Sequence, residues 1–374
     1  MAQRVVEPVE SVRRREAATP LQLVWWKFSQ HRLAVAGAVA IVVLYSIALF
    51  ADFLAPYSPH HRTGQPYAPP QVPHWRTEDG WTLRPHVYAL RGKLDSRTFR
   101  RVYVPDTSRS YPVRFFVRGH SYRLFGLLET DVHLFGTPDG GSIYLMGTDQ
   151  LGRDVFSRVI YGARVSLTIG LVGVAISLVL GILLGGLSGY FGGWTDMLIQ
   201  RLIEILLSFP SIPLWMALAA ALPEHWSPLT VYFGITVILS FIGWTNLARV
   251  VRGRFLSLRN EDFIVAARLS GSSELRIIRK HLLPSFMSHI IASVTLSIPG
   301  MILAETSLSF LGIGLRPPVI SWGVLLQDAQ NIHAVAMAPW LMLPGLFVVV
   351  AVLAFNFVGD GLRDAADPYA ITGP

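Results

Sequence analysis

The residues that could carry enzymatic chemistry do not form the motifs that such chemistry requires. The sequence holds no GxxxxGK[ST] phosphate loop, because its single Gly-Lys pair, Gly92-Lys93, is followed by Leu94. HExxH and closely spaced His/Cys ligand sets are absent, and so is GxSxG. With 0 cysteines, the chain can form neither a disulfide nor a thiolate. We therefore expect no enzyme activity from this chain alone, and no bound cofactor or metal.

Glu305 stands out because it interrupts a long apolar run, where an ionisable side chain usually has a function. It follows Pro284 by about 20 residues, or about 30 Å along a helix, which places it near the outer edge of a membrane span. Two interpretations are open: an edge carboxylate that bonds Thr306 or Ser307, or an outer gate formed with Ser309. The sequence shows no paired set of buried Asp, Glu or His that would mark a proton relay.

A second stretch with distinctive chemistry is Asn260–Pro284, a basic island between two apolar runs. Its spacing predicts two short helices joined by Gly271, which can adopt the left-handed conformation that ends a helix, with Ser272 or Ser273 capping the second. The first helix would present small groups around one aromatic, and the second would present an apolar face. These faces comprise Phe263, Ala266, Ala267 and Ser270, then Leu275, Ile278 and Leu282, with Pro284 ending the helix. The stretch is either a helical loop on a membrane surface or an element that docks into a groove on another protein.

The elements that must position these residues are membrane spans. Of the 374 residues, 52% are hydrophobic and 15% are charged, whereas an ordinary soluble domain has about 25% charged residues. Several apolar runs reach the ~20 residues that cross a bilayer core, and the first is too long for a signal peptide. We expect an all-α polytopic membrane protein with six transmembrane helices, at about 33–55, 166–190, 197–220, 229–248, 286–311 and 339–358.

The third and the second of these spans have distinctive local features. In the third, two prolines, Pro210 and Pro213, interrupt the helix, and Arg201 and Glu204 are spaced to pair with each other. In the second, Gly181, Gly185 and Gly189 recur every four residues, a spacing that lets membrane helices approach closely. These glycines predict packing within the bundle or against a sister subunit.

Lysine and arginine in the short flanking segments predict the orientation. They are concentrated in residues 1–32 and 249–280, whereas the turn at 222–228 has none and the segment after the fifth span has only Arg316. The positive-inside rule then places both termini and the helix pair in the cytoplasm. The predicted division is a cytoplasmic N-terminal segment (1–32), a first transmembrane helix (33–55), an external region (56–146), a five-helix core (147–358) with the helix pair at 260–284, and a cytoplasmic tail (359–374).

The external region has two parts in this prediction. Its first part, to Pro73, is rich in proline and is typical of an extended linker. From Thr98 to Met146, short β-like runs (FRRVYV, YPVRFFV, YRLFGLL and SIYLM) alternate with turn signals. We expect a small β-rich insertion between the first and second transmembrane helices. Its aromatic residues, among them Trp75 and Trp81, are more often the core of a small domain than a sugar or peptide site.

The stretch VAARLSGSSELRIIRKHLLP resembles the EAA loop of ABC importer permeases, with Val265 where a glutamate is typical. Further motifs are similar to the C-type permease subunit of the dipeptide/oligopeptide (Dpp/Opp-type) branch. They are WKFSQHRLA, GTDQLGRDVFSRVIYGARVSL, GYFGGWTD, ETSLSFLGIGLRPPVISWG and GDGLRDAADPY. The resemblance covers most of 24–56 and 145–370 but not 59–142, where family members usually have a much shorter outer loop.

The resemblance implies a permease of the bacterial inner membrane that forms half of a translocation path for di- or oligopeptides. It implies a homologous second permease, two cytoplasmic ATPase subunits that use the ATP, and a periplasmic or lipid-anchored solute-binding protein as partners. The helix pair would be the coupling helix that sits in an ATPase groove. The implied coupling residues are Ala266, Ala267, Gly271, Ser272, Arg276, His281, Leu283 and Pro284.

Two other functions stay open. The same type of importer could carry oligosaccharides, because this branch includes sugar carriers with very similar permease motifs. An ion-coupled secondary transporter would need a buried ion site or broken-helix repeats, and the sequence offers little sign of either. Substrate identity and the residues that touch substrate are not encoded in a recognisable motif.

Overall fold

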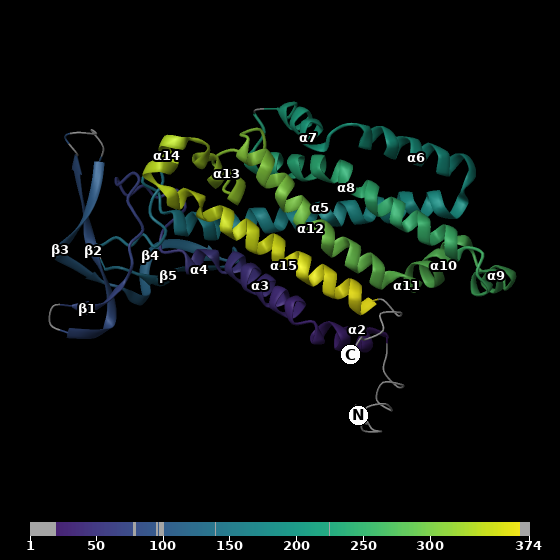
Figure 1. Cartoon of the computed structure of the whole chain (residues 1–374), viewed down its shortest axis with the longest axis horizontal. Helices are drawn as coiled ribbons and strands as arrows, with labels where there is room; N and C mark the ends of the chain where they lie inside the picture. Colours follow the sequence, from purple (N-terminus) through teal and green to yellow (C-terminus); the bar gives the residue numbers. More distant parts are fainter. Residues whose placement is uncertain are drawn as a thin grey trace, which may run out of the picture.

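The computed structural model describes residues 20–77, 80–94, 96, 101–138, 140–223 and 225–366. Long helices run side by side to form an elongated bundle, and the β-strands gather at one end of it (Figure 1). The short helices α9 to α11 lie at the opposite end. The arginines that precede residue 20, and residues 367–374 of the predicted tail, lie outside the described residues.

Among the described residues, five helical segments are long and apolar enough to cross a membrane, or six if a bent pair counts as one span. The five are α3 (Arg32–Leu49), α5 (Val155–Phe191), α8 (Pro228–Leu258), α12 (Met287–Phe310) and the segment Pro339–Ala365, which joins η3 (Pro339–Met342) to α15 (Leu343–Ala366). This arrangement confirms the predicted class, a polytopic helical protein with a β-rich insertion. α15 continues to Ala366, so the predicted boundary at 358 falls inside a helix.

The bent pair is the predicted third span. It consists of α6 (Gly193–Ser208) and α7 (Ser211–Ala220), which meet at an angle of 88°. Phe209 and Pro210 between them have extended backbone, as expected where a proline restricts the residue before it. The predicted pair of Arg201 and Glu204 forms with a distance of 2.8 Å between nitrogen and oxygen.

The centre of the bundle is the contact between α5 and α8, which lie side by side in Figure 1. The glycine spacing in α5 explains how closely they approach. A Cβ at Gly185 would lie 2.4 Å from the carbonyl oxygen of Ala248, and one at Gly189 would lie 2.7 Å from that of Arg252. Both distances are shorter than a carbon–oxygen contact allows, so only glycine fits. The glycine repeat therefore packs within this chain.

The insertion forms two antiparallel sheets. β1 (His74–Thr77), β2 (Gly80–Leu94) and β3 (Arg101–Pro112) form one sheet, and β4 (Arg114–Leu124) pairs with β5 (Leu128–Gly136) in the other. Two details of the predicted runs are wrong. YRLFGLL is the turn between β4 and β5 with the strand ends beside it, and SIYLM is irregular. The sheet also starts at His74, earlier than predicted.

Short helices complete the fold between the long ones. α2 (Pro20–Gln30) precedes α3, and α4 (Ala51–Leu54) follows it. The helix pair consists of α9 (Asp262–Leu269), α10 (Glu274–Ile277), the π-helical turn η1 (Ile278–Leu282) and α11 (Leu283–Ser285). After α12 come α13 (Trp322–Gln327), η2 (Asp328–Gln330) and α14 (Ile332–Met337).

Candidate functional site

The helix pair turns sharply at Gly271, as predicted. Gly271 has a φ of 74°, in the left-handed region. Its N–H donates to the carbonyl of Arg268 at 3.0 Å, and the Ser272 N–H donates to that of Ala267 at 3.1 Å. These two bonds form a Schellman motif, which satisfies the last carbonyls of α9. Ser273 occupies the N-cap position of α10, but its side chain makes no capping hydrogen bond.

Three apolar side chains hold the helix pair on the bundle. Ile264 of α9, Ile277 of α10 and Leu282 of η1 are fully buried. They pack with Tyr190 at the end of α5 and Phe255 near the end of α8 in one cluster. The pair is thereby attached to the two central helices of the bundle.

The buried face of the second helix differs from the predicted one. Leu275 was expected to share a face with Ile278 and Leu282, but it is 64% exposed, and Ile277 is buried instead. The reason is the π-helical turn that begins at Ile278, because a wider turn aligns residues five apart. Ile277 and Leu282 have this spacing. The helix also continues one residue past Pro284, to Ser285.

The outer surface of the helix pair exposes large apolar side chains among charged ones. Leu269 is 85% exposed, and Phe263 and Leu275 are also exposed. Of the residues assigned to coupling, Ala266, Gly271, Arg276 and Pro284 are exposed, while Ala267, Ser272, His281 and Leu283 are half-buried. Exposed large apolar side chains grouped on one element are typical of a protein contact surface.

Glu305 belongs to a separate site, in the last two turns of α12, and the structure does not bring it near the helix pair. The side chain is fully buried. Three hydroxyl groups donate to its carboxylate, at 2.8 Å from Ser309, 2.6 Å from Ser321 and 3.3 Å from Ser166. The expected hydrogen bond to Thr306 or Ser307 is wrong, whereas Ser309, the residue named with Glu305 as a possible outer gate, is one of its partners. Thr306 Oγ1 itself has no hydrogen-bond partner among the described residues.

The same serines connect Glu305 to the backbone of neighbouring elements. Ser166 of α5 accepts the N–H of Trp322, Ser321 accepts that of Val324, and Ser309 accepts that of Leu315. One carboxylate thus joins α5, α12, α13 and the loop before α13. Ser166 and Ser321 were not predicted, since single serines far apart in the sequence carry no recognisable pattern.

A second buried network was also missed by the sequence analysis. Asp149 accepts hydrogen bonds from the Leu151 N–H at 2.8 Å and from Arg153 Nε at 2.7 Å, and it forms an ion pair with Arg158 of α5. Asp149 and Arg158 are both almost fully buried. Arg158 also lies 3.9 Å from Asp328 in η2. The stretch GTDQLGRDVFSR contains Asp149, Arg153 and Arg158, so its charged positions could have indicated a structural network.

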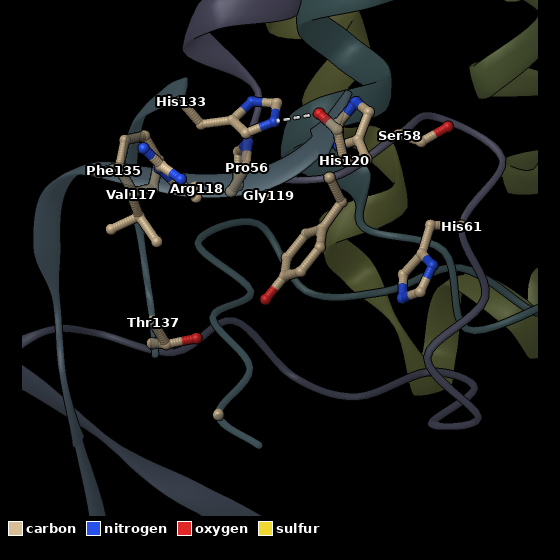
Figure 2. A pocket seen from close by; sticks show the side chains of 13 residues that line it. Pro56, Ser58, His61, Val117, Arg118, Gly119, His120, His133, Phe135 and Thr137 are labelled. Carbon is tan, nitrogen blue, oxygen red and sulfur yellow. Dashed lines mark hydrogen bonds between the residues drawn. The ribbon is translucent and has the colours of Figure 1, made fainter. Parts of the chain in front are cut away.

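A small cavity lies between the linker and the β4–β5 hairpin. It has a volume of about 190 Å³, and Figure 2 shows His61, His120 and His133 among its lining residues. The ring centroids of His120 and His133 are 4.4 Å apart, and His133 Nε2 lies 3.1 Å from the carbonyl oxygen of His120. Burial, and to a lesser extent the neighbouring His133, lowers the pKa of His120 to about 4. Among the described residues, no group of three or more His, Cys, Asp or Glu side chains could hold a metal ion.

Comparisons with known proteins place this architecture. Residues 177–371, just over half of the chain, match the binding-protein-dependent transport system inner membrane component family. Residues 19–70 match the N-terminal TM domain of oligopeptide transport permease C. The β-rich insertion lies between the two matches.

Curated relatives agree. The oligopeptide transport system permease protein OppC of Haemophilus influenzae is 40% identical over 242 residues, which cover 64% of this chain and 75% of the relative. The dipeptide transport system permease protein DppC of Alkalihalophilus pseudofirmus is 42% identical over 223 residues, 59% of this chain and 71% of the relative. The glutathione transport system permease protein GsiD of Pectobacterium atrosepticum is 39% identical over 228 residues, 61% of this chain and 73% of the relative.

Among solved structures, the inward-facing MetNI methionine ABC transporter has a similar chain, with a TM-score of 0.45, 19% identity, and coverage of 56% of this chain and 96% of that one. The sequence matches are far closer than this structural one. They show that the chain belongs to the family of binding-protein-dependent transport system inner membrane components, the membrane-spanning transport permeases of ABC importers.

Proposed function

We propose that this chain is the permease subunit of an ATP-driven importer of di- or oligopeptides, and that its helix pair couples transport to ATP hydrolysis. As a member of its family, it works with ATPase subunits, a substrate-binding protein and a second permease. The peptide assignment draws on the relatives, which are named as oligopeptide and dipeptide permeases. The ATP is used by two ATPase partners, and this chain binds no cofactor. Both termini and the helix pair face the cytoplasm in this proposal, and the β-rich insertion faces outward.

One observation carries the coupling role: the helix pair buries Ile264, Ile277 and Leu282 against the bundle while leaving Phe263 and Leu269 exposed. An element with exposed apolar side chains on its outer face and a firm attachment to α5 and α8 can transmit a displacement of a docked partner into the spans. Its exposed aromatic and aliphatic side chains are the kind that fill a groove on a partner protein.

A variant at Gly271 tests coupling with little effect on packing. A Cβ there would meet no described atom within 4 Å, so the cost of a substitution comes from the left-handed backbone, about 1–2 kcal/mol for an ordinary side chain. We expect Gly271→Val to reduce peptide uptake per ATP hydrolysed in proteoliposomes that contain the assembled transporter. Gly271→Asn should retain most of the coupling, because asparagine tolerates this conformation.

Gly253 supplies the matched control. It lies exposed in α8, and a Cβ there would also meet no described atom within 4 Å, but its backbone is helical. Gly253→Ala should leave uptake unchanged. Wild-type uptake by Gly271→Val with the ATPases assembled would show that the helix pair does not couple transport.

The substrate is tested separately. We expect the partner binding protein to bind di- or oligopeptides and to stimulate their uptake through the wild-type complex. Binding and uptake of oligosaccharides instead of peptides would contradict the peptide assignment and leave the coupling role intact.

A further inference from the structure

The turn of the β4–β5 hairpin exposes an unusual cluster of apolar side chains. Leu127 is 90% exposed, Leu128 is 64% exposed and Phe125 is 53% exposed. The turn spans Phe125, Gly126 and Leu127 between the two strands. Phe125 has a φ of 54°, a left-handed conformation that costs an aromatic residue free energy. This turn therefore keeps three large apolar side chains exposed although its backbone is strained.

The length of α3 gives the level of this turn relative to the membrane. α3 has 18 residues from Arg32 to Leu49, a length of about 27 Å, close to the ~30 Å of a bilayer core. With Arg32 at one boundary, Phe50 lies at the other. A polar cluster marks the same level, since Arg164 donates to the carbonyls of Ala48 and Leu49 and pairs with Asp52 at 2.5 Å.

The hairpin turn touches α3 at that boundary. The rings of Phe125 and Phe50 lie 5.7 Å apart between centroids in an edge-on arrangement, and those of Phe116 and Phe53 lie 6.2 Å apart. Figure 1 shows β4 and β5 beside α4, immediately beyond the end of α3. The apolar turn therefore continues the exposed apolar surface of the first span, which includes Val39, Val42, Val43, Leu49 and Phe50.

From this continuity we infer that the β4–β5 turn inserts Phe125, Leu127 and Leu128 into the outer boundary of the lipid bilayer beside the first span. The lipid surface is the occupant that matches an apolar patch joined to a lipid-facing helix. Contact with lipid would remove the exposed leucines from water and hold the β-rich insertion at a fixed position relative to the membrane.

The cysteine-free sequence allows a direct test. Leu127→Cys, labelled with an environment-sensitive fluorophore, is placed in the assembled transporter in lipid nanodiscs. Two quenchers are compared: a nitroxide on the lipid acyl chain near the headgroup, and iodide in solution. Val104→Cys is the matched control, a 45% exposed apolar position on β3, a strand that lies farther from α3 than β4 and β5 do in Figure 1.

We expect the lipid nitroxide to quench the label at Leu127 and iodide to leave it bright, with the reverse at Val104. Adding Leu128→Ser should raise the iodide quenching at Leu127. Two results overturn the inference. Quenching at Leu127 by iodide alone means that the turn is in water, and protection from both quenchers means that a protein subunit covers it.

Discussion

The two ends of the helix bundle are held together by different kinds of contact. At the end with the helix pair, the fully buried contacts are apolar, as in the cluster of Ile264, Ile277 and Leu282 with Phe255, and the ion pair of Arg252 with Asp196 is only partly buried. Towards the end with the insertion, buried polar networks connect the elements, one around Glu305 and one around Asp149 and Arg158. Apolar contacts are non-directional, whereas buried hydrogen-bonded charges require one geometry. The end with the insertion is therefore a rigid frame, whereas the end with the helix pair can change its packing at a lower cost in free energy.

The largest effect in this comparison should come from Asp149. We expect Asp149→Ala to lower the free energy of unfolding by about 3–5 kcal/mol, because Arg158 would keep a buried charge without its main partner. Glu204→Ala is the control, since the pair of Arg201 and Glu204 is largely exposed and contributes about 0–1 kcal/mol. Thermal unfolding in nanodiscs measures both. Equal losses would mean that the buried network does not act as a frame.

Glu305 should have the next largest effect. Glu305→Ala removes the acceptor of three hydroxyl groups and leaves a cavity, for a loss of about 2–4 kcal/mol. Glu305→Gln keeps the volume and one oxygen, so its loss should be smaller. Unfolding and peptide uptake are measured together. Unchanged stability with abolished uptake would favour a gate over a frame at this position.

Two residues of α10, Leu275 and Ile277, test how the end with the helix pair is held together. Ile277→Ala should destabilise by about 2 kcal/mol, because Ile277 is fully buried. Leu275→Ala should change stability by less than about 0.5 kcal/mol and still reduce uptake per ATP, because Leu275 faces the proposed ATPase. The same assays on both variants separate packing from coupling. Loss of stability without loss of coupling at Leu275 would place that side chain inside the protein.

The sequence predicts well those features that depend on residues close together in the chain. The long apolar runs predict the spans, Pro210 predicts the break between α6 and α7, and Gly271 predicts the turn of the helix pair. Each of these depends on a local property, such as apolar length or backbone freedom. The spacing of Gly181, Gly185 and Gly189 likewise predicts close helix packing, although not that the partner is α8.

The features that escaped prediction depend on distant residues. Ser166 lies 139 residues from Glu305, so no local pattern reveals their hydrogen bond. The π-helical turn at 278–282 reverses the expected exposure of Leu275, and its register is set by what packs against it. SIYLM alternates like a strand, yet Tyr144 instead exchanges hydrogen bonds with Gln71, whose side chain accepts from the Tyr144 N–H at 2.8 Å.

The smallest expected effect concerns the insertion and depends on pH. Because burial lowers the pKa of His120 to about 4 from an ordinary value of 6.5, the folded hairpin binds a proton less readily than the unfolded one. The stability that neutral His120 contributes is present above pH 6.5 and is lost as the pH falls towards 4. The groups around it are Asp52 on α4, His61 in the linker and His133 on β5. The protection factors of the β4 and β5 amides, which compare each exchange rate with the intrinsic rate at the same pH, should therefore fall over this range.

Two variants decide whether His120 is responsible. His120→Gln should weaken the pH dependence of exchange in the hairpin, whereas His225→Gln, at an exposed position outside the insertion, should leave it unchanged. Exchange in α5 and α8 serves as the internal reference, since their contact is made largely of glycine and apolar residues. An unaltered pH profile in His120→Gln would assign the response to another group. The same pH dependence of exchange in the hairpin and in the bundle would mean that the insertion does not respond to pH separately from the bundle.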